Sequence, residues 1–548
     1  MPRKKQLKIA VIDAETDPFK YGRIPKPFAW GFFDGEKYVE FWGKLCTELL
    51  LDFLDTEDTE YLIFAHNGGK FDFFFLIDRL ENPVKIINGR IVKAKLGKHT
   101  LQDSYAIMPY PLAGITGGKL EIDYSCMESN VREAHKEEIL KYLRVDCEEL
   151  YKAVSAFVSK FGVQLTIGGT AFKELKKLHP VRNTSREFDE KYRHFYFGGR
   201  CQAFKTGVLN GPYKVFDVNS MYPDVMRRFS HPLTDRFITV TGNGHIDKAG
   251  RLIKFGRDRP YFIRFSGINR GALPLRIESG PNKGGLDFTS KSGIYHATSH
   301  EIIVALKHKM IEIKEVFEIH IPCEVGSFGE YVDMCMNGKL SAEERGDMID
   351  RLFYKLLANS AYGKFAQNPD NFFDWAICKS DEEVINLLEE NPEYDLHEKT
   401  GEFTIWKKPS ASDRFNNVAT AASITGASRA CLLDALGHAT DPVYSDTDSI
   451  ICRDLSGVDI DRVRIGAWKH EADLDRIYIA GKKLYAGYDS EGECVKLASK
   501  GARLSGDDIQ KICMGGEVEW ANDPPSFQFG TPIEQAKFTK RTIRAHHL

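Results

Sequence analysis

The sequence predicts an α/β protein of several domains, and three observations support this. The chain has 548 residues, enough for two to four domains with separate cores. Short runs of β-branched and aromatic residues, typical of strands, occur together with long stretches of helical periodicity. Acidic residues stand repeatedly at the ends of the predicted strands, where a fold of this class can present functional groups.

The composition is that of a soluble globular protein, with 42% hydrophobic and 28% charged residues. The formal net charge of -3 does not indicate a nucleic-acid binder, so any basic surface must be local. The eleven cysteines form no CxxC pair, which favours free thiols in a reducing compartment. No apolar run approaches the length of a membrane span. These features predict a soluble, cytoplasmic protein that does not bind membranes, and we expect it to be a monomer.

The first third of the chain contains four acidic residues on three predicted elements. The elements are a strand at 7–15, a loop at 66–72 after a strand at 61–65, and a helix at 137–161. Two acids two residues apart share one strand face, and a tyrosine four residues before the last acid shares its helix face. On its own, the loop is more readily explained as an ordinary Asn-Gly-Gly turn. The set is Asp13, Glu15, Asp72 and Asp146, with Tyr142.

A second acidic set comes from two distant segments. Asp217 ends the predicted strand of Lys-Val-Phe-Asp-Val, followed by a turn at 219–222, while Asp446 and Asp448 occupy the tip of a predicted hairpin. Asp-Thr-Asp-Ser is also common turn composition, so the hairpin alone is weak. An acid on a strand beside this hairpin would hold two divalent ions for phosphoryl transfer, about 3.5–4 Å apart.

One predicted helix between these segments carries cations and an aromatic ring on one face, suited to bind a triphosphate and stack on a base. A solvated basic helix face is the alternative. The residues of this face are Arg351, Lys355, Asn359 and Tyr362, with Leu352, Leu356 and Leu357 facing elsewhere for packing.

In order and residue type, these segments resemble motifs A, B and C of family B DNA polymerases. They are most similar to the protein-primed branch of small tailed bacteriophages and linear plasmids. Motif A is Asp217 with Ser-Met-Tyr-Pro, and motif B runs from Lys355 to Gly363. The resemblance implies metal binding by Asp217, Val218, Asp446 and Asp448, phosphate contact by Lys355 with Arg351 or Lys339, and a nucleotide pocket formed by Tyr222, Asn359 and Tyr362.

The first set resembles the Exo I, II and III motifs of proofreading 3'-5' exonucleases with an RNase H-like fold. The resemblance implies metal binding by its four acids and a water-orienting role for Tyr142. It also implies contacts to the single-stranded primer end or the scissile phosphate from His66, Asn67, Phe71, Phe75 and Lys119. The sequence Asp103-Ser-Tyr departs from the usual Leu, so these DNA contacts are less well supported than the metal ligands.

Two further motifs match in order. Residues 193–200 resemble the Tyr-x-Gly-Gly loop that contacts template DNA in this family, with Tyr196, Gly198, Gly199 and the charge of Arg200. Lys-Lys-Leu-Tyr at 482–485 resembles the Lys-x-Tyr motif, in which Lys483 and Tyr485 would hold the primer terminus. A plain glycine turn and an ordinary strand edge are the local alternatives.

The resemblance also divides the chain into an exonuclease domain and a right-hand polymerase domain with two insertions. The long intervals between motifs predict structured insertions, called terminal protein regions one and two. The composition of the second predicts an exposed excursion. The expected boundaries are 1–164 for the exonuclease, 165–233 and 413–498 for the palm, 234–332 and 370–412 for the insertions, 333–369 for the fingers and 499–548 for the thumb.

The sequence therefore predicts a DNA-directed DNA polymerase that replicates a linear viral or plasmid genome from a protein primer, displaces the other strand and proofreads. The expected cofactor is magnesium, two ions per site, with manganese as a substitute. The expected partners are template and primer DNA, deoxynucleoside triphosphates and a terminal protein. Two alternatives remain open: a primer-independent family B polymerase of a mobile element, and a catalytically idle DNA-binding protein.

Overall fold

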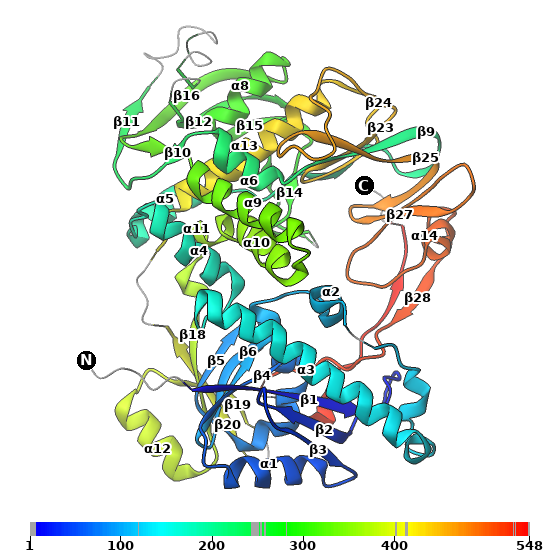
Figure 1. Cartoon of the computed structure of the whole chain (residues 1–548). Helices are drawn as coiled ribbons and strands as arrows, with labels where there is room; N and C mark the ends of the chain where they lie inside the picture. The colour runs from blue at the N-terminus through cyan, green and yellow to red at the C-terminus, as the bar shows by residue number, and fades with distance from the viewer. Residues whose placement is uncertain are drawn as a thin grey trace.

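The computed structural model describes most of the chain and places two large β-sheets at opposite ends of the molecule (Figure 1). Lys119 lies outside the described residues. Within the described part, no helix is long and apolar enough to cross a membrane. The structure describes residues 7–118, 120–242, 251, 255–256, 259–280, 282–399, 403–410, 415–529, 531 and 533–545.

The first sheet has ten strands in the order β19-β20-β18-β5-β6-β7-β4-β1-β2-β3. Strand β4 pairs in parallel with β1 and β7, and the other neighbours are antiparallel. The strands from the first third of the chain are β1 (Lys8–Thr16), β2 (Pro27–Phe33), β3 (Tyr38–Trp42), β4 (Tyr61–Ala65), β5 (Leu80–Ile87), β6 (Arg90–Leu96) and β7 (His99–Asp103).

Helices pack on both faces of this sheet. Helix α1 (Cys46–Thr56) buries Cys46, Leu50 and Leu54 on one face. Helix α3 (Lys136–Phe161) packs on the other, and its core continues through α4 (Ile167–Leu178) into the second half of the molecule. Two short 3-10 helices (Gly68–Lys70, Asp72–Arg79) follow β4, and α2 (Leu112–Thr116) precedes α3.

The segment expected as the second insertion extends the first sheet. It contains β18 (Phe373–Cys378), α12 (Asp381–Glu390), β19 (Asp395–Lys399) and β20 (Thr404–Pro409). The Asn82 side chain fixes the junction, because it donates to the Ile377 carbonyl and accepts from the Ile377 amide. Ile377 and Ile405 are buried in the same core as β1 and β4. The expectation of an exposed excursion agrees with α12 and β19, in which no residue is buried, but it is wrong for the end of β18 and for Ile405 of β20, which pack in the core.

The second sheet has seven strands in the order β27-β26-β25-β9-β23-β22-β8. Helices α6 (Met221–Arg228) and α13 (Val418–Leu436) share a core with residues of β9 and β23. The strands are β8 (Cys201–Ala203), β9 (Gly207–Val218), β22 (Tyr444–Asp446), β23 (Ser449–Cys452), β25 (Trp468–Gly481), β26 (Leu484–Tyr488) and β27 (Cys494–Ser499).

Helix α6 begins at Met221, so the last two residues of the turn predicted at 219–222 already belong to the helix. Ser220, at φ 54°, turns the chain, and the helix starts at Met221. Pro223 lies in its first turn, where the missing amide proton is not needed.

The first insertion forms a small sheet of its own. Its strand order is β11-β16-β12-β15, and α8 (Ser299–Lys307) packs against it and against α13. The strands are β11 (Phe237–Thr241), β12 (Phe262–Arg270), β15 (Ser290–Thr298) and β16 (Ile311–Pro322). Two short antiparallel strand pairs accompany them: β10 (His231–Pro232) with β17 (Val325–Gly326), and β13 (Leu275–Arg276) with β14 (Leu286–Asp287).

Three consecutive helices cross between the two sheets (Figure 1). They are α9 (Gly329–Glu344), α10 (Met348–Ser360) and α11 (Tyr362–Phe365). On α10, Leu352, Leu356 and Leu357 are buried as their spacing predicts. Phe157 of α3 meets Phe353 edge-on at 5.3 Å, so α10 and the first-sheet half share one core.

The last segment packs at two distant places. Helix α14 (Gly506–Cys513) and the hairpin β28 (Val518–Ala521) with β29 (Lys540–Ile543) adjoin β25 and β26. The connection between β28 and β29 reaches the first sheet, where Phe527 and Phe529 are 4% and 5% exposed. Phe527 stacks on Phe74 at 5.4 Å, and Phe529 meets Trp375 of the second insertion edge-on at 5.7 Å.

Candidate active sites

The four acids of the first set lie around strand β1. Asp13 and Glu15 belong to β1, and the carboxylate of Asp72 accepts a hydrogen bond from the backbone amide of Ala14 between them. Asp146 comes from α3, which packs against β1. Glu15, Asp72 and Asp146 are only 7%, 3% and 5% exposed. Burial and the neighbouring Asp103 raise the pKa of Asp72, which is the effect expected of an acid that lacks a cation.

The charges of two of these acids, Glu15 and Asp146, act on Tyr142. Its hydroxyl is 3.3 Å from that of Tyr124. Burial, the Tyr124 hydroxyl and the charges of Asp146 and Glu15 raise its pKa, so the phenol stays protonated. A protonated phenol beside carboxylates can orient a water molecule.

The residues expected to contact a primer end lie beside this set. His66 has one ring nitrogen 3.0 Å from the Ser104 hydroxyl and the other 2.9 Å from the Tyr110 carbonyl. Asn67 accepts a hydrogen bond of 2.9 Å from Arg90. Phe71 and Phe75 meet edge-on at 5.1 Å, and both contact Phe527.

The sequence interpretation missed the ion pair that supports this loop. The buried carboxylate of Asp103 pairs with Arg90 and accepts from the amide of Gly69 at 3.2 Å. Arg90 thereby joins Asn67 to the end of β7. An aspartate at the end of an apolar strand was a usable signal, but its partner Arg90 on a neighbouring strand has no fixed spacing from it in sequence.

The second set is assembled at the centre of the second sheet. Register pairs Ser449 with Asp217, and the amide of Val218 donates to the Asp448 carbonyl at 2.8 Å. Asp446 pairs with Ser449 across the hairpin, which Thr447 turns at φ 57°. Burial, then the charges of Asp448 and Glu471, raise the pKa of Asp217 to about 7. Burial and Asp446 likewise raise the pKa of Asp448.

Cations from the neighbouring strands approach these acids. Lys483 forms an ion pair of 2.7 Å with Asp446, and its amide donates to the Tyr444 hydroxyl. Tyr485 lies against Tyr444, with ring centroids 4.7 Å apart. Lys469 and Glu471 on β25 form a pair of 2.8 Å that acts on the Asp217 charge, and the sequence interpretation did not single it out.

The predicted nucleotide-binding residues come together from three elements. Tyr222 of α6 and Tyr362 of α11 stack with centroids 4.0 Å apart and an interplanar angle of 5°. Lys355 on α10 is exposed and donates to the Tyr110 hydroxyl at 3.1 Å. The Asn359 side chain donates to the Lys355 carbonyl at 2.8 Å.

Two cations near Lys355 remain equivalent candidates for triphosphate contact. Arg351 and Lys339 both pair with Glu343, at 2.6 and 3.8 Å. The structure therefore gives each the same acidic partner and does not choose between them.

The loop at 196–199 lies against α13, which is linked by an ion pair to the first insertion, and against the motif C hairpin. Buried Arg429 of α13 donates to the carbonyls of Phe197 at 2.6 Å and Gly198 at 2.9 Å, and pairs with buried Glu301 of α8 at 2.8 Å. A Cβ at Gly199 would lie 2.9 Å from Thr447, so this glycine allows the two loops to touch. An arginine in an otherwise small and apolar helix was the signal for this role.

Two further arginines lie next to this loop. One contradicts the expectation from the sequence, and the other was not singled out there. Arg200 was expected to present charge to template phosphate, but it is 4% exposed, lies 4.6 Å from the Phe288 ring and donates to Gln202. The structure corrects that expectation, because the guanidinium faces the interior. Arg276 of the first insertion instead donates to the Tyr196 carbonyl.

Comparison with known proteins agrees with this geometry. A family model described as "DNA polymerase type B, organellar and viral" matches residues 119–448. The DNA-directed DNA polymerase of Enterobacteria phage PRD1 is 44% identical over 577 aligned residues, which cover 99% of this chain and all of the relative. This chain belongs to the type B DNA polymerases. The enzyme is therefore a DNA-directed DNA polymerase.

More distant proteins share its architecture. The DNA polymerase of Bacillus phage M2 is 24% identical, covering 72% of this polymerase and 68% of the relative. Phi29 DNA polymerase bound to primer-template DNA and incoming nucleotides superposes with a TM-score of 0.72 at 16% identity, covering 99% and 100% of the two chains. Its complex with single-stranded DNA gives 0.65 at 19% identity over 90% of each. At this identity the likeness establishes the fold: an exonuclease domain with a palm, fingers and thumb.

Proposed function

We propose that the polymerase extends a primer at the Asp217 site and removes 3' nucleotides at the Asp13 site. The single observation that supports this is the presence of two clusters of buried or half-buried carboxylates, one at each of the two large sheets. An idle binding protein gains nothing from burying mutually repelling acids, since each costs folding free energy unless a cation neutralises it.

Both carboxylate groups suit magnesium. Their donors are oxygen atoms, which hard cations prefer, and raised pKa values mark Asp72, Asp217 and Asp448 as short of positive charge. Asp217 and Asp448, with the Val218 carbonyl and Asp446 nearby, would hold two ions at one site, and Asp13, Glu15, Asp72 and Asp146 two ions at the other. Bound magnesium lowers the pKa of the attacking oxygen and neutralises charge on the leaving oxygen.

The other residues would bind and orient the substrates. Lys355 would contact the triphosphate, while Tyr222, Asn359 and Tyr362 form the pocket for the incoming nucleotide. Lys483 and Tyr485 would hold the primer terminus, and Tyr196, Gly198 and Gly199 the template. At the nuclease, Tyr142 would orient the water, and His66, Asn67, Phe71 and Phe75 would hold the unpaired end. Lys119 keeps this expected role without structural support, since it is outside the described residues.

We further propose that synthesis begins on a hydroxyl of a terminal protein in the host cytoplasm and displaces the second strand. Support comes from the two insertions, which fill the sequence intervals that distinguish the protein-primed branch. The first contacts the template loop through Arg276, and the second is continuous with the exonuclease sheet. Both are therefore placed to act on DNA or on a priming protein at the two catalytic domains.

The two-site proposal is tested on a labelled recessed primer with magnesium. Asp448→Asn should abolish extension and leave stepwise shortening intact, whereas Asp13→Ala should abolish shortening and leave extension intact. Asp473→Asn, an exposed acid on the same sheet, is the control and should change neither. Loss of both activities from either active-site change would contradict the assignment. Synthesis on a single-stranded template without a primer or a priming protein would contradict only the proposal of protein priming and would leave the two-site assignment intact.

A further inference from the structure

A group of three side chains that belongs to neither carboxylate site has the composition of a transition-metal site. In the described part of the chain, His308, Asp434 and His438 are the one group of three or more His, Cys, Asp or Glu residues whose ligand atoms all lie within 4.8 Å of one another. His308 follows α8 of the first insertion, and Asp434 and His438 come from the end of α13 and just beyond it. The group therefore joins the insertion to the palm.

The local packing favours this arrangement. The His308 Nε2 atom lies 2.7 Å from the Asp434 Oδ1 atom, and the two imidazole rings are 5.6 Å apart. A Cβ at Gly437 would lie 2.3 Å from the His308 ring, so only glycine leaves room for it. The carboxyl ends of α8 and α13 converge here, and their partial negative charge attracts a cation.

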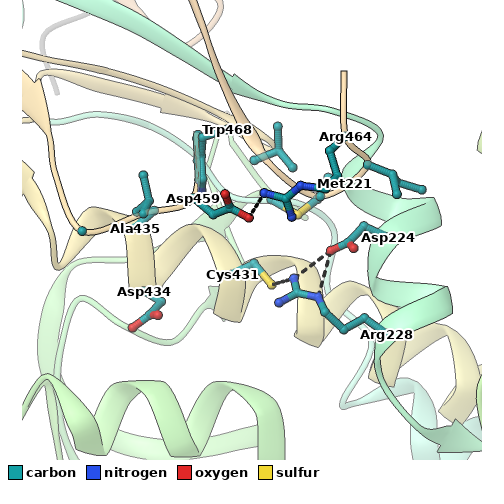
Figure 2. Close-up of a pocket in the computed structure, with 14 residues that line it drawn as sticks. Met221, Asp224, Arg228, Cys431, Asp434, Ala435, Asp459, Arg464 and Trp468 are labelled. Atoms are coloured by element: carbon teal, nitrogen blue, oxygen red, sulfur yellow. Dashed lines mark hydrogen bonds and ion pairs between the residues drawn. The ribbon is translucent and has the colours of Figure 1, made fainter. Parts of the chain in front are cut away.

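Asp434 also lies at the edge of a neighbouring cavity. Figure 2 shows Asp434 at its rim, with its carboxylate directed away from the Asp224–Arg228 pair. Within the cavity, Arg228 pairs with Asp224 at 2.7 Å, and Arg464 pairs with Asp459. These charges neutralise one another, so the cavity itself offers no comparable binding group.

We propose that His308, Asp434 and His438 bind one divalent transition-metal ion, for which Zn²⁺ is the probe. Two imidazoles and one carboxylate are ligands that zinc prefers over magnesium, and a fourth position stays open to water. Tetrahedral zinc requires ligand atoms about 3.3 Å apart. A pair at the 4.8 Å limit would close by about 1.5 Å, and the His308–Asp434 pair, at 2.7 Å, would open by about 0.6 Å. Bound metal would fasten α8 to α13, and α13 carries Arg429, which holds the template loop.

Lys307 provides a built-in competitor. Its ammonium group lies 2.6 Å from the same Asp434 oxygen. A metal ion must share or displace this contact, so removing the lysine charge should strengthen binding. This prediction is specific to a metal site. If no metal binds, removing Lys307 only removes an ion pair and would destabilise the fold.

The test measures cobalt and zinc binding by the full chain carrying Asp13→Ala and Asp448→Asn, with excess magnesium, so that the carboxylate sites contribute little. One equivalent of Co²⁺ should give a visible tetrahedral spectrum, and saturating Zn²⁺ should raise the Tm by about 2 °C. His308→Gln and His438→Gln should each lose that equivalent and that shift. Lys307→Gln should lower the Kd several-fold.

His135→Gln is the matched control, because His135 also faces one carboxylate, that of Glu138 at 3.2 Å, but belongs to no such group of three. It should bind the full equivalent. In the otherwise native chain, His308→Gln and His438→Gln should retain primer extension, which shows that they fold. An unchanged cobalt equivalent in either histidine variant, or a weaker Kd for Lys307→Gln, would overturn the proposal.

Discussion

At the scale of single residues, the stacked rings of Tyr222 and Tyr362 would determine which sugar the proposed nucleotide pocket accepts. Their centroids are 4.0 Å apart, and both side chains are partly buried beside motif A. A rigid ring that supports the sugar of a nucleotide leaves no space for a 2'-hydroxyl group, the group that distinguishes RNA from DNA.

Replacing Tyr222 with Val should therefore relax sugar selection. We expect discrimination against ribonucleotides, as a ratio of kcat/KM values, to fall by about tenfold or more because the steric barrier is removed. Single-nucleotide incorporation with paired ribo- and deoxynucleotides measures it. Tyr354→Val on α10 is a control, and unaltered discrimination in Tyr222→Val would assign the selection to another residue.

A second residue, Tyr110, connects the two catalytic domains through its hydroxyl and its carbonyl. The hydroxyl accepts from Lys355 at 3.1 Å, and the carbonyl lies 2.9 Å from His66. Tyr110→Phe removes only the first contact. It should free Lys355 for the triphosphate and lower the KM for deoxynucleotides about two- to threefold at unchanged kcat. A raised KM would show that Tyr110 presents Lys355 instead of restraining it.

The sequence could predict that Asp217, Asp446 and Asp448 come together, because a strand end and a hairpin tip determine where such residues lie; their role as metal ligands stays a prediction. Asp217 and Asp448 illustrate this, since register brings them to one edge. Arg429 and Arg90 were missed, because each acts on backbone or on a side chain distant in sequence. Arg200 was placed wrongly because its own position does not reveal that Phe288, from the first insertion, covers it.

At the scale of elements, the connection between β28 and β29 is part of two domains. Its neighbours in sequence contribute to the core at α14, while Phe527 inserts among Phe71, Phe74 and Phe75. The aromatic spacing of this segment gave no sign of such a distant partner. We keep the predicted thumb at 499–548 as a proposal for its first part, around α14. The residues near Phe527 are not included, because they pack on the exonuclease half.

Phe527→Ala should detach this connection without unfolding the sheet. Removing a buried ring costs about 3 kcal/mol, and the loss is local because the segment crosses the surface of the first sheet. Hydrogen exchange should rise between β28 and β29 and around Phe71, with little change in β22 and β23. Phe255→Ala, at an exposed ring elsewhere, serves as control. Exchange that rises equally throughout would indicate global destabilisation instead.

At the scale of the whole molecule, buried histidines make stability depend on pH. His231 and His300 both contact the Ser423 hydroxyl of α13, at 2.9 and 3.2 Å, and His300 comes from α8 of the first insertion. Burial lowers the pKa of His231 to about 4 and that of His300 to about 3. The unfolded chain binds these protons near pH 6.5, whereas the folded chain does not. Stability is therefore complete above pH 6.5 and falls as the pH decreases toward 4.

Each histidine should remove about 2 kcal/mol of stability between pH 6.5 and pH 5. His300→Gln keeps a polar group near Ser423 but does not titrate, so its Tm should fall less than that of the native chain over this interval. Scanning calorimetry at pH 7 and pH 5 measures the difference. An equal decrease in both proteins would assign the acid sensitivity to other groups.

The position of Phe527 also has a consequence for synthesis on the ribosome. The acids Asp13 and Asp72 leave the ribosome early, but the aromatic cluster around Phe71 is completed only when nearly the whole chain has been translated. A growing chain therefore carries its nuclease residues long before their surroundings are finished. Full capacity to degrade DNA should arrive together with the capacity to copy it.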